Sequence, residues 1–207
     1  MDIQFHGANC LTLVTKQARV VVDDNLADLG GKSVAKAGDI ALFTGAHADP
    51  TQPAKIMIDQ PGEYEVSEVS IYGIAARAHM DEDDKKTATM YKLMVDDLRI
   101  LITGHVYPEL SDAQLEAIGM VDVMFVPVGG HGYTLDAVGA LKLIKKIEPK
   151  LVIPTHYDDK ALTFSVPQQS LEEAIKALGM EPKETVAKLK LKQSEMSDVT
   201  QLIVLES

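Results

Sequence analysis

Three short apolar runs each end in a loop that carries a histidine, and this recurring arrangement constrains the fold more than any other feature. The first run, residues 40–43, stops at a small-residue loop with His47 and Asp49. The two later runs lead to His105 and His156. Apolar runs of this length are typical of buried strands, and the ends of such strands gather in one crevice. We therefore expect the three histidines to lie at the same edge of the molecule.

The spacing of apolar residues predicts a strand-rich first half, with strands and helices alternating after residue 98. Strands are expected over residues 3–5, 10–14, 19–22, 40–43, 55–58, 63–66, 69–76, 89–95, 98–103, 121–126, 151–154, 187–191 and 201–205. Helices are expected over residues 111–118, from Thr134 to a stop at Pro149, and over 168–178, because apolar residues recur there with helical spacing. The charge run at 81–86 is interpreted as a solvated hairpin loop.

The composition predicts one domain, residues 1–207, in which 46% hydrophobic residues can build a single core. A net charge of −11 argues against a nucleic-acid or anionic-membrane surface, because phosphates are held by clustered Lys and Arg. No apolar run approaches ~18 residues and the start lacks the pattern of a signal peptide, so we expect a cytoplasmic protein. The single cysteine, Cys10, rules out an intramolecular disulfide and is expected in the core. A homo-oligomer is left open.

Several blocks of the chain carry a family resemblance. They are residues 3–10, the loop at 44–49, GEYEV at 62–66, VDVMFVPVGG at 121–130, YTLDA at 133–137 and PKLVIPTHY at 149–157. In these blocks the chain resembles the metallo-β-lactamase-fold superfamily, and within it the small metal-dependent hydrolases of the kind that includes L-ascorbate-6-phosphate lactonase. The resemblance implies an α+β fold, a four-layer αββα sandwich of two mixed sheets, with a metal site built from loops at one edge. It also implies hydrolysis of a lactone, an ester or a phosphodiester.

The first metal motif of the family is only partly kept. On the family pattern T-H-x-H-x-D-H, the chain retains the second histidine as His47 and the aspartate as Asp49. Gly45 and Pro50 stand where the first and last histidines belong. The family's usual dinuclear zinc site holds each ion with three protein ligands. With two of its four ligand positions changed, this motif cannot provide the ligands that the dinuclear site takes from it.

The remaining candidates suit one metal ion rather than two. By the same resemblance, Ile102 falls at the family's third metal histidine and His105 at its bridging aspartate, whereas His156 is kept. What is left is a histidine-rich set with one carboxylate, suited to a single Zn²⁺, Fe²⁺ or Mn²⁺, made of His47, Asp49, His105 and His156. In such a site Asp49 would orient or deprotonate the attacking water.

Each candidate also has a structural interpretation. His47 and His105 fit solvated loop histidines, and Asp49 before Pro50 fits a cap for the segment that follows. His156 fits a packed, hydrogen-bonded remnant. Two further histidines on predicted strands are interpreted as structural, His6 and His79.

Two functions therefore follow from the sequence. One is a metal-dependent hydrolase with a remodelled single-metal site, and the other is a non-catalytic pseudo-hydrolase that binds a ligand or a protein partner at the former active-site edge. The fold does not decide between them. The substrate is not identified, because no loop carries a recognisable specificity motif.

Overall fold

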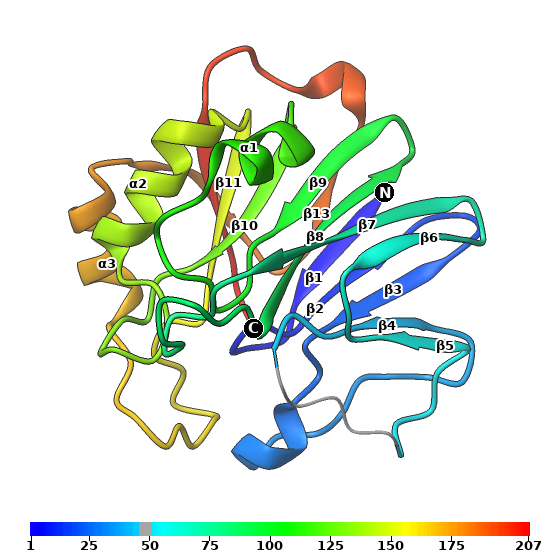
Figure 1. Ribbon diagram of the computed structural model, residues 1–207, viewed down its shortest axis with the longest axis horizontal. Helices are drawn as coiled ribbons and strands as arrows, with labels where there is room; N and C mark the ends of the chain where they lie inside the picture. Colours follow the sequence, from blue (N-terminus) through cyan, green and yellow to red (C-terminus); the bar gives the residue numbers. More distant parts are fainter. Residues whose placement is uncertain (46–50) are drawn as a thin grey trace.

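The computed structural model describes residues 1–45 and 51–207, and the strands of these residues form two sheets that pack face to face (Figure 1). The smaller sheet has the order β13-β1-β2-β3-β4-β5. Its strands are β1 (Asp2–Phe5), β2 (Leu11–Val14), β3 (Arg19–Val22), β4 (Ile40–Leu42), β5 (Ile56–Ile58) and β13 (Leu189–Lys190). The first three strands form the antiparallel meander that their alternating apolar residues favour.

The larger sheet has the order β12-β14-β11-β10-β9-β8-β7-β6. Its strands are β6 (Gly62–Val66), β7 (Val69–Ala76), β8 (Ala88–Val95), β9 (Leu98–Ile102), β10 (Val123–Pro127), β11 (Leu151–Thr155), β12 (Pro182–Val186) and β14 (Gln201–Leu205). Strands β9, β10 and β11 run parallel to one another. Their carboxyl ends therefore open at the same edge of the sheet, which is the edge that receives the loop histidines.

The core lies between the two sheets, and the Tyr91 hydroxyl forms a polar contact across it. Tyr91 on β8 is fully buried, and its hydroxyl lies 3.1 Å from each of two carbonyl oxygens of the smaller sheet, those of Phe43 and Ile58. A buried hydroxyl needs such a partner, because an unpaired one is destabilising. The pKa of Tyr91 is raised, with burial as the main cause.

The three α-helices among the described residues lie outside the larger sheet (Figure 1). They are α1 (Asp112–Ile118), α2 (Ala137–Ile147) and α3 (Leu171–Leu178). Each begins at a polar cap whose side chain accepts from a backbone N–H of the first turn: Ser111, Asp136 and Ser170. Among the described residues, none of these helices is both long and apolar enough to cross a membrane.

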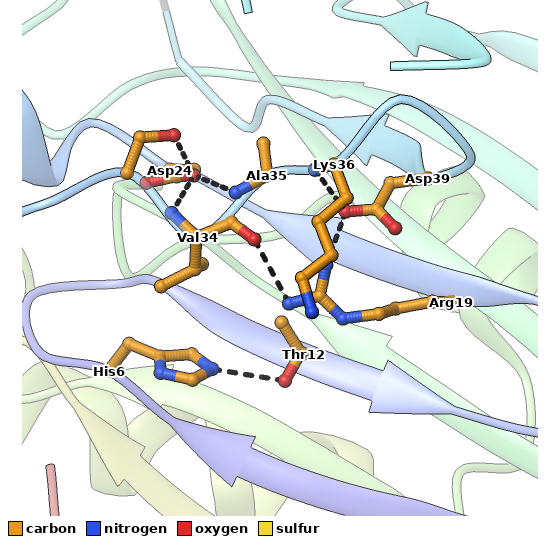
Figure 2. Close-up of polar contacts among 9 residues, drawn as sticks. His6, Thr12, Arg19, Asp24, Val34, Ala35, Lys36 and Asp39 are labelled. Atoms are coloured by element: carbon orange, nitrogen blue, oxygen red, sulfur yellow. Dashed lines mark hydrogen bonds and ion pairs between the residues drawn. The ribbon is translucent and has the colours of Figure 1, made fainter. Parts of the chain in front are cut away.

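The outer face of the smaller sheet is covered by the segment 24–39 and its 3₁₀ helix η1 (Leu26–Leu29). Figure 2 shows the polar contacts that fix this segment. Asp24 Oδ2 accepts hydrogen bonds from Ser33 Oγ and from the backbone nitrogens of Val34 and Ala35, each at 2.8 Å. Further along, Asp39 accepts from the Lys36 backbone nitrogen and pairs with the Arg19 guanidinium. A second apolar cluster lies beneath, made of Cys10, Val21, Leu26, Ala41 and Phe43.

The expected α+β sandwich of two mixed sheets is confirmed. Its layers differ in one respect: the smaller sheet is covered by a hydrogen-bonded loop segment with the short helix η1, where an α-helical layer was expected. Cys10 lies in the core as expected, and burial raises the pKa of its thiol well above the ordinary value.

Some details of the elements differ from expectation. The helices expected from Thr134 and from residue 168 begin at Ala137 and Leu171. The strand expected over 187–191 is reduced to the short β13, next to the 3₁₀ helix η2 (Gln193–Glu195). In contrast, β12 was not predicted, because it is an edge strand rich in exposed polar residues and pairs only with β14 in the described chain.

Candidate functional site

His156 follows β11 directly and is held in one orientation. Its backbone nitrogen donates to the Ala8 carbonyl at 2.7 Å, and its φ of 54° places it in the left-handed region. The ring Nδ1 lies 3.1 Å from Gln168 Oε1, while Gln168 Nε2 donates to the Val166 carbonyl at 2.7 Å. Because the amide oxygen can only accept, His156 Nδ1 carries the hydrogen and Nε2 is left as the acceptor. Burial lowers the pKa of His156 to about 4, so the ring is neutral at pH 7.

His105 follows β9 and packs against His156. The two imidazole rings meet edge to face with centroids 4.5 Å apart, and the Tyr133 ring lies 5.1 Å from His105. His105 Nδ1 is buried and has no hydrogen-bond partner in the part of the chain that the structure describes. Burial first, and then the neighbouring His156 and His79, hold the pKa of His105 well below its ordinary value. His105 is therefore a packed, neutral histidine rather than a solvated one.

Asp23 is buried at the end of β3. Its two carboxylate oxygens accept from the backbone nitrogen of Thr44 at 2.7 Å and from its hydroxyl at 2.5 Å. Burial raises the pKa of Asp23 to about 6, although the Thr44 bonds oppose the shift. The Asn9 amide also lowers this pKa, but its Nδ2 makes no geometrically acceptable hydrogen bond within the described chain. Gly104, with φ of 62°, lets the loop before His105 approach, since a Cβ there would lie 2.3 Å from the Thr44 side chain.

These residues line a cavity of about 720 Å³ at the edge where the parallel strands end. This volume is in the range of small-molecule sites. Another part of the wall comes from η1 and from residues 163–165 of the loop after β11. The two are joined by a hydrogen bond of 2.8 Å from the Thr163 nitrogen to the Leu29 carbonyl. The described lining residues are Ala8, Asn9, Asp23, Asn25, Asp28, Leu29, Thr44, Gly45, His105, Tyr133, His156, Thr163, Phe164, Ser165 and Gln168.

The expectation that the loop histidines gather at one edge is confirmed for His105 and His156 by their ring contact. The other two candidate ligands, His47 and Asp49, lie outside the described residues, as does Pro50. Their roles as ligands, and that of Asp49 in catalysis, remain predictions.

Comparison with known proteins decides the family. A model of the beta-lactamase superfamily domain matches residues 2–156, which is more than half of the chain. The chain belongs to this superfamily. Among its relatives, a UPF0173 metal-dependent hydrolase from Thermoplasma acidophilum is 25% identical over 205 residues, covering 82% of this chain and 88% of the relative. Another, from Pyrococcus furiosus, is 30% identical over 146 residues, covering 65% of this chain and 62% of the relative.

Solved structures agree with the superfamily fold. A metallo-beta-lactamase superfamily protein from Thermotoga maritima superposes with a TM-score of 0.77 at 24% identity, and the match covers 100% of both chains. The metallo hydrolase Igni18 from Ignicoccus hospitalis gives a TM-score of 0.60 at 18% identity, covering 86% of this chain and 90% of the other. At these identities the similarity supports the fold, and the chemistry depends on the residues present in this chain.

Two positions at which the family resemblance expects metal histidines lie in the described part of this chain. Ile102, at one of them, is 3% exposed and lies in the core between the neighbouring strands β8 and β10. Gly45, at the other, has no side chain to offer. Among residues 1–45 and 51–207, no group of three His, Cys, Asp or Glu side chains is placed to hold a metal ion. Zinc in proteins takes three or four protein ligands, so His105 and His156 alone do not fit it.

Several residues that line the cavity were not predicted as site residues, among them Asp23, Phe164 and Gln168. Asp23 follows the strand predicted over 19–22, and a carboxylate at such a strand end is a weak signal of a site. Phe164 comes from a loop without regular spacing, and Gln168 was expected to begin a helix but lies before α3. His6 and His79 lie just after β1 and β7 rather than on them. The structural interpretation of His6 is supported by a 3.0 Å contact between its Nε2 and Thr12 Oγ1 (Figure 2).

Proposed function

We propose that this chain is a binding protein built on a metal-dependent hydrolase scaffold, which holds a small molecule in the cavity beside His105 and His156 and does not hydrolyse it at a metal. The observation that carries the proposal is that these two imidazoles pack edge to face without a third His, Cys, Asp or Glu ligand among the described residues. The named relatives are metal-dependent hydrolases, so the family implies a divalent ion. The described donor set does not fit that ion, and no reaction step is assigned to it.

The other polar groups of the cavity support binding rather than hydrolysis. Asp23 accepts a hydrogen bond from Thr44 at each of its oxygens, which fixes the orientation of this carboxylate. Asn9 uses its Oδ1 to accept from the Thr155 hydroxyl at 2.7 Å, and its buried Nδ2 is close enough to Asp23 to lower the pKa of that carboxyl. A cavity lined by fixed polar groups suits the recognition of a polar group on a ligand.

Hydrolysis assays test this proposal. The chain is incubated with p-nitrophenyl acetate, dihydrocoumarin or bis(p-nitrophenyl) phosphate, each with and without added Zn²⁺, Mn²⁺ or Fe²⁺. We expect no rate above that of buffer and metal alone, because no water-activating centre is assembled. Metal-dependent turnover that disappears in His156→Ala would contradict the proposal.

A single-metal hydrolase is the second candidate, and one observation favours it. Gln168 fixes the hydrogen on His156 Nδ1 and leaves Nε2 as the acceptor, which is the arrangement that outer-shell partners give to metal-ligating histidines. In this candidate His47 and Asp49 would complete the set with His105 and His156, and the ion would be Zn²⁺, Mn²⁺ or Fe²⁺. It requires about one divalent ion per chain, lost in His156→Ala and weakened in acid.

A further inference from the structure

The described walls of the cavity carry negative charge and no positive side chain. Asp23 lies in the buried part and Asp28 at the exposed rim, on η1. No Lys or Arg lines the cavity among the described residues. Residues 46–50 add none either, because their sequence is AHADP. A carboxylate or phosphate on a ligand would therefore meet like charge without a counter-ion.

Nor does the amino end of α2 provide an anion site. α2 begins shortly after Tyr133, and a free helix amino end attracts anions through its unpaired N–H groups. Here the chain's own Asp136 occupies that position, since its Oδ1 accepts from the Gly139 nitrogen at 2.7 Å. The amino end of α2 is therefore already satisfied by a carboxylate of this chain.

Aromatic rings form the other part of the wall. Phe164 lies on the loop after β11 and Tyr133 on the loop after β10. Their ring centroids are 5.3 Å and 5.8 Å, respectively, from that of the His156 imidazole. The Phe164 loop is tied to η1 through the adjacent hydrogen bond from Thr163 to Leu29. Such rings favour flat apolar groups, and the faces of Phe and Tyr also attract cations.

We propose that the cavity selects a neutral or cationic small molecule that carries an aromatic or heteroaromatic ring, and discriminates against anions. This inference rests on the proposed function, because it names the class of ligand that the same cavity would hold. Two groups of observations support it: the carboxylates without a Lys or Arg partner among the described lining residues, and the Phe164 and Tyr133 rings beside His156.

The test uses three probes with one ring and different charges: benzylamine, benzyl alcohol and phenyl phosphate. Their dissociation constants are measured with the full chain at pH 7.5 by following its amide signals in NMR titrations, at a salt concentration that screens the overall charge. We expect benzylamine and benzyl alcohol to shift the signals of cavity residues, and benzylamine to bind at least about tenfold more tightly than phenyl phosphate.

Two matched variants separate the local effect from the net charge of −11. Asp28→Lys reverses a rim charge, and Asp198→Lys makes the same change at an exposed residue that does not line the cavity. We expect Asp28→Lys to reduce the preference for benzylamine over phenyl phosphate by about threefold or more, and Asp198→Lys to change it by less than about twofold.

The outcomes distinguish this inference from the proposed function. If phenyl phosphate binds as tightly as benzylamine, or if both Lys variants change the preference equally, the ligand class is wrong while the cavity stays a binding site. If none of the three probes shifts the signals of cavity residues, the ligand class and the proposed function are both overturned.

Discussion

Asp23 and His156 line the same cavity, and burial shifts their pKa values in opposite directions. The pKa of Asp23 is about 6 in the fold against 3.8 as the ordinary value, so the folded chain keeps a proton that the unfolded chain has released. Protonated Asp23 is favoured in the fold, so the stability that it contributes at low pH is lost as pH rises from about 4 to 6. The pKa of His156 is about 4 against 6.5, so the unfolded chain takes up its proton first. The stability that neutral His156 contributes is therefore lost as pH falls from 6.5 to 4. The lowered pKa of His105 likewise makes the fold less stable in acid.

Asp23→Asn should isolate the first effect. Asparagine mimics the protonated acid and can still bond Thr44, so the variant lacks the ionisation that destabilises the wild type above pH 6. The free energy of unfolding of the variant minus that of the wild type should be larger at pH 7.5 than at pH 4 by about 3 kcal/mol, so the variant is relatively more stable at the higher pH, from 1.36 kcal/mol per pKa unit. Urea unfolding of both proteins at the two pH values measures this difference. An equal difference at both values would mean that the pKa of Asp23 is not raised by the fold.

His156→Gln should isolate the second effect. The wild type loses stability between pH 6.5 and 4 because its folded state resists protonation of this ring, and the variant should lose about 3 kcal/mol less over that interval. The matched control is His131→Gln at an exposed loop position, which should leave the pH dependence unchanged. The readout is again urea unfolding across the interval. The account would be contradicted if His156→Gln and His131→Gln gave the same pH dependence.

At the scale of elements, the segment 24–39 covers the outer face of the smaller sheet, where the family resemblance implies a helical layer. It contributes Asn25, Asp28 and Leu29 to the cavity wall, so its position affects ligand binding as well as the cover of the smaller sheet. A loop without regular backbone bonds needs other partners for its N–H groups. Asp24 supplies these at its Oδ2, which accepts three hydrogen bonds.

Asp24→Ala should detach this segment while leaving the sheets intact. The variant leaves the nitrogens of Val34 and Ala35 without their acceptor, and charge-assisted bonds of this kind contribute about 2–4 kcal/mol in total. We expect a loss of unfolding free energy in that range and faster amide hydrogen exchange at Val34 and Ala35. Asp198→Ala, at an exposed site, is the control and should change neither quantity. Unchanged exchange in Asp24→Ala would show that other contacts fix the segment.

The same scale shows what the sequence could and could not predict. The convergence of His105 and His156 was predictable, because each follows an apolar strand and parallel strands end at one edge. The cover over the smaller sheet was not, because it depends on an aspartate that bonds nitrogens ten and eleven residues away in an aperiodic loop. The partnership of Asp23 with Thr44 was missed for the same reason, since it joins residues 21 apart.

At the scale of the whole molecule, the fold and the family resemblance can be compared. The fold superposes along the full chain on a metallo-beta-lactamase superfamily structure with a TM-score of 0.77, and sequence relatives are named metal-dependent hydrolases. At two positions where the resemblance expects metal histidines, this chain has an apolar side chain, Ile102, and a glycine, Gly45. The residues that specify packing and those that specify chemistry are different sets, so a chain can keep one and change the other.

The most direct test of this account is the amount of zinc bound per chain, measured by elemental analysis after dialysis against zinc and then against metal-free buffer. The wild type should retain far less than one ion. The variant that combines Gly45→His, Pro50→His, Ile102→His and His105→Asp has the ligands that the family resemblance expects at these positions and should retain about two, with increased thermal stability when zinc is present. Circular dichroism of both proteins confirms that each is folded. About one zinc per wild-type chain, absent from His156→Ala, would contradict the account and establish the single-metal site instead.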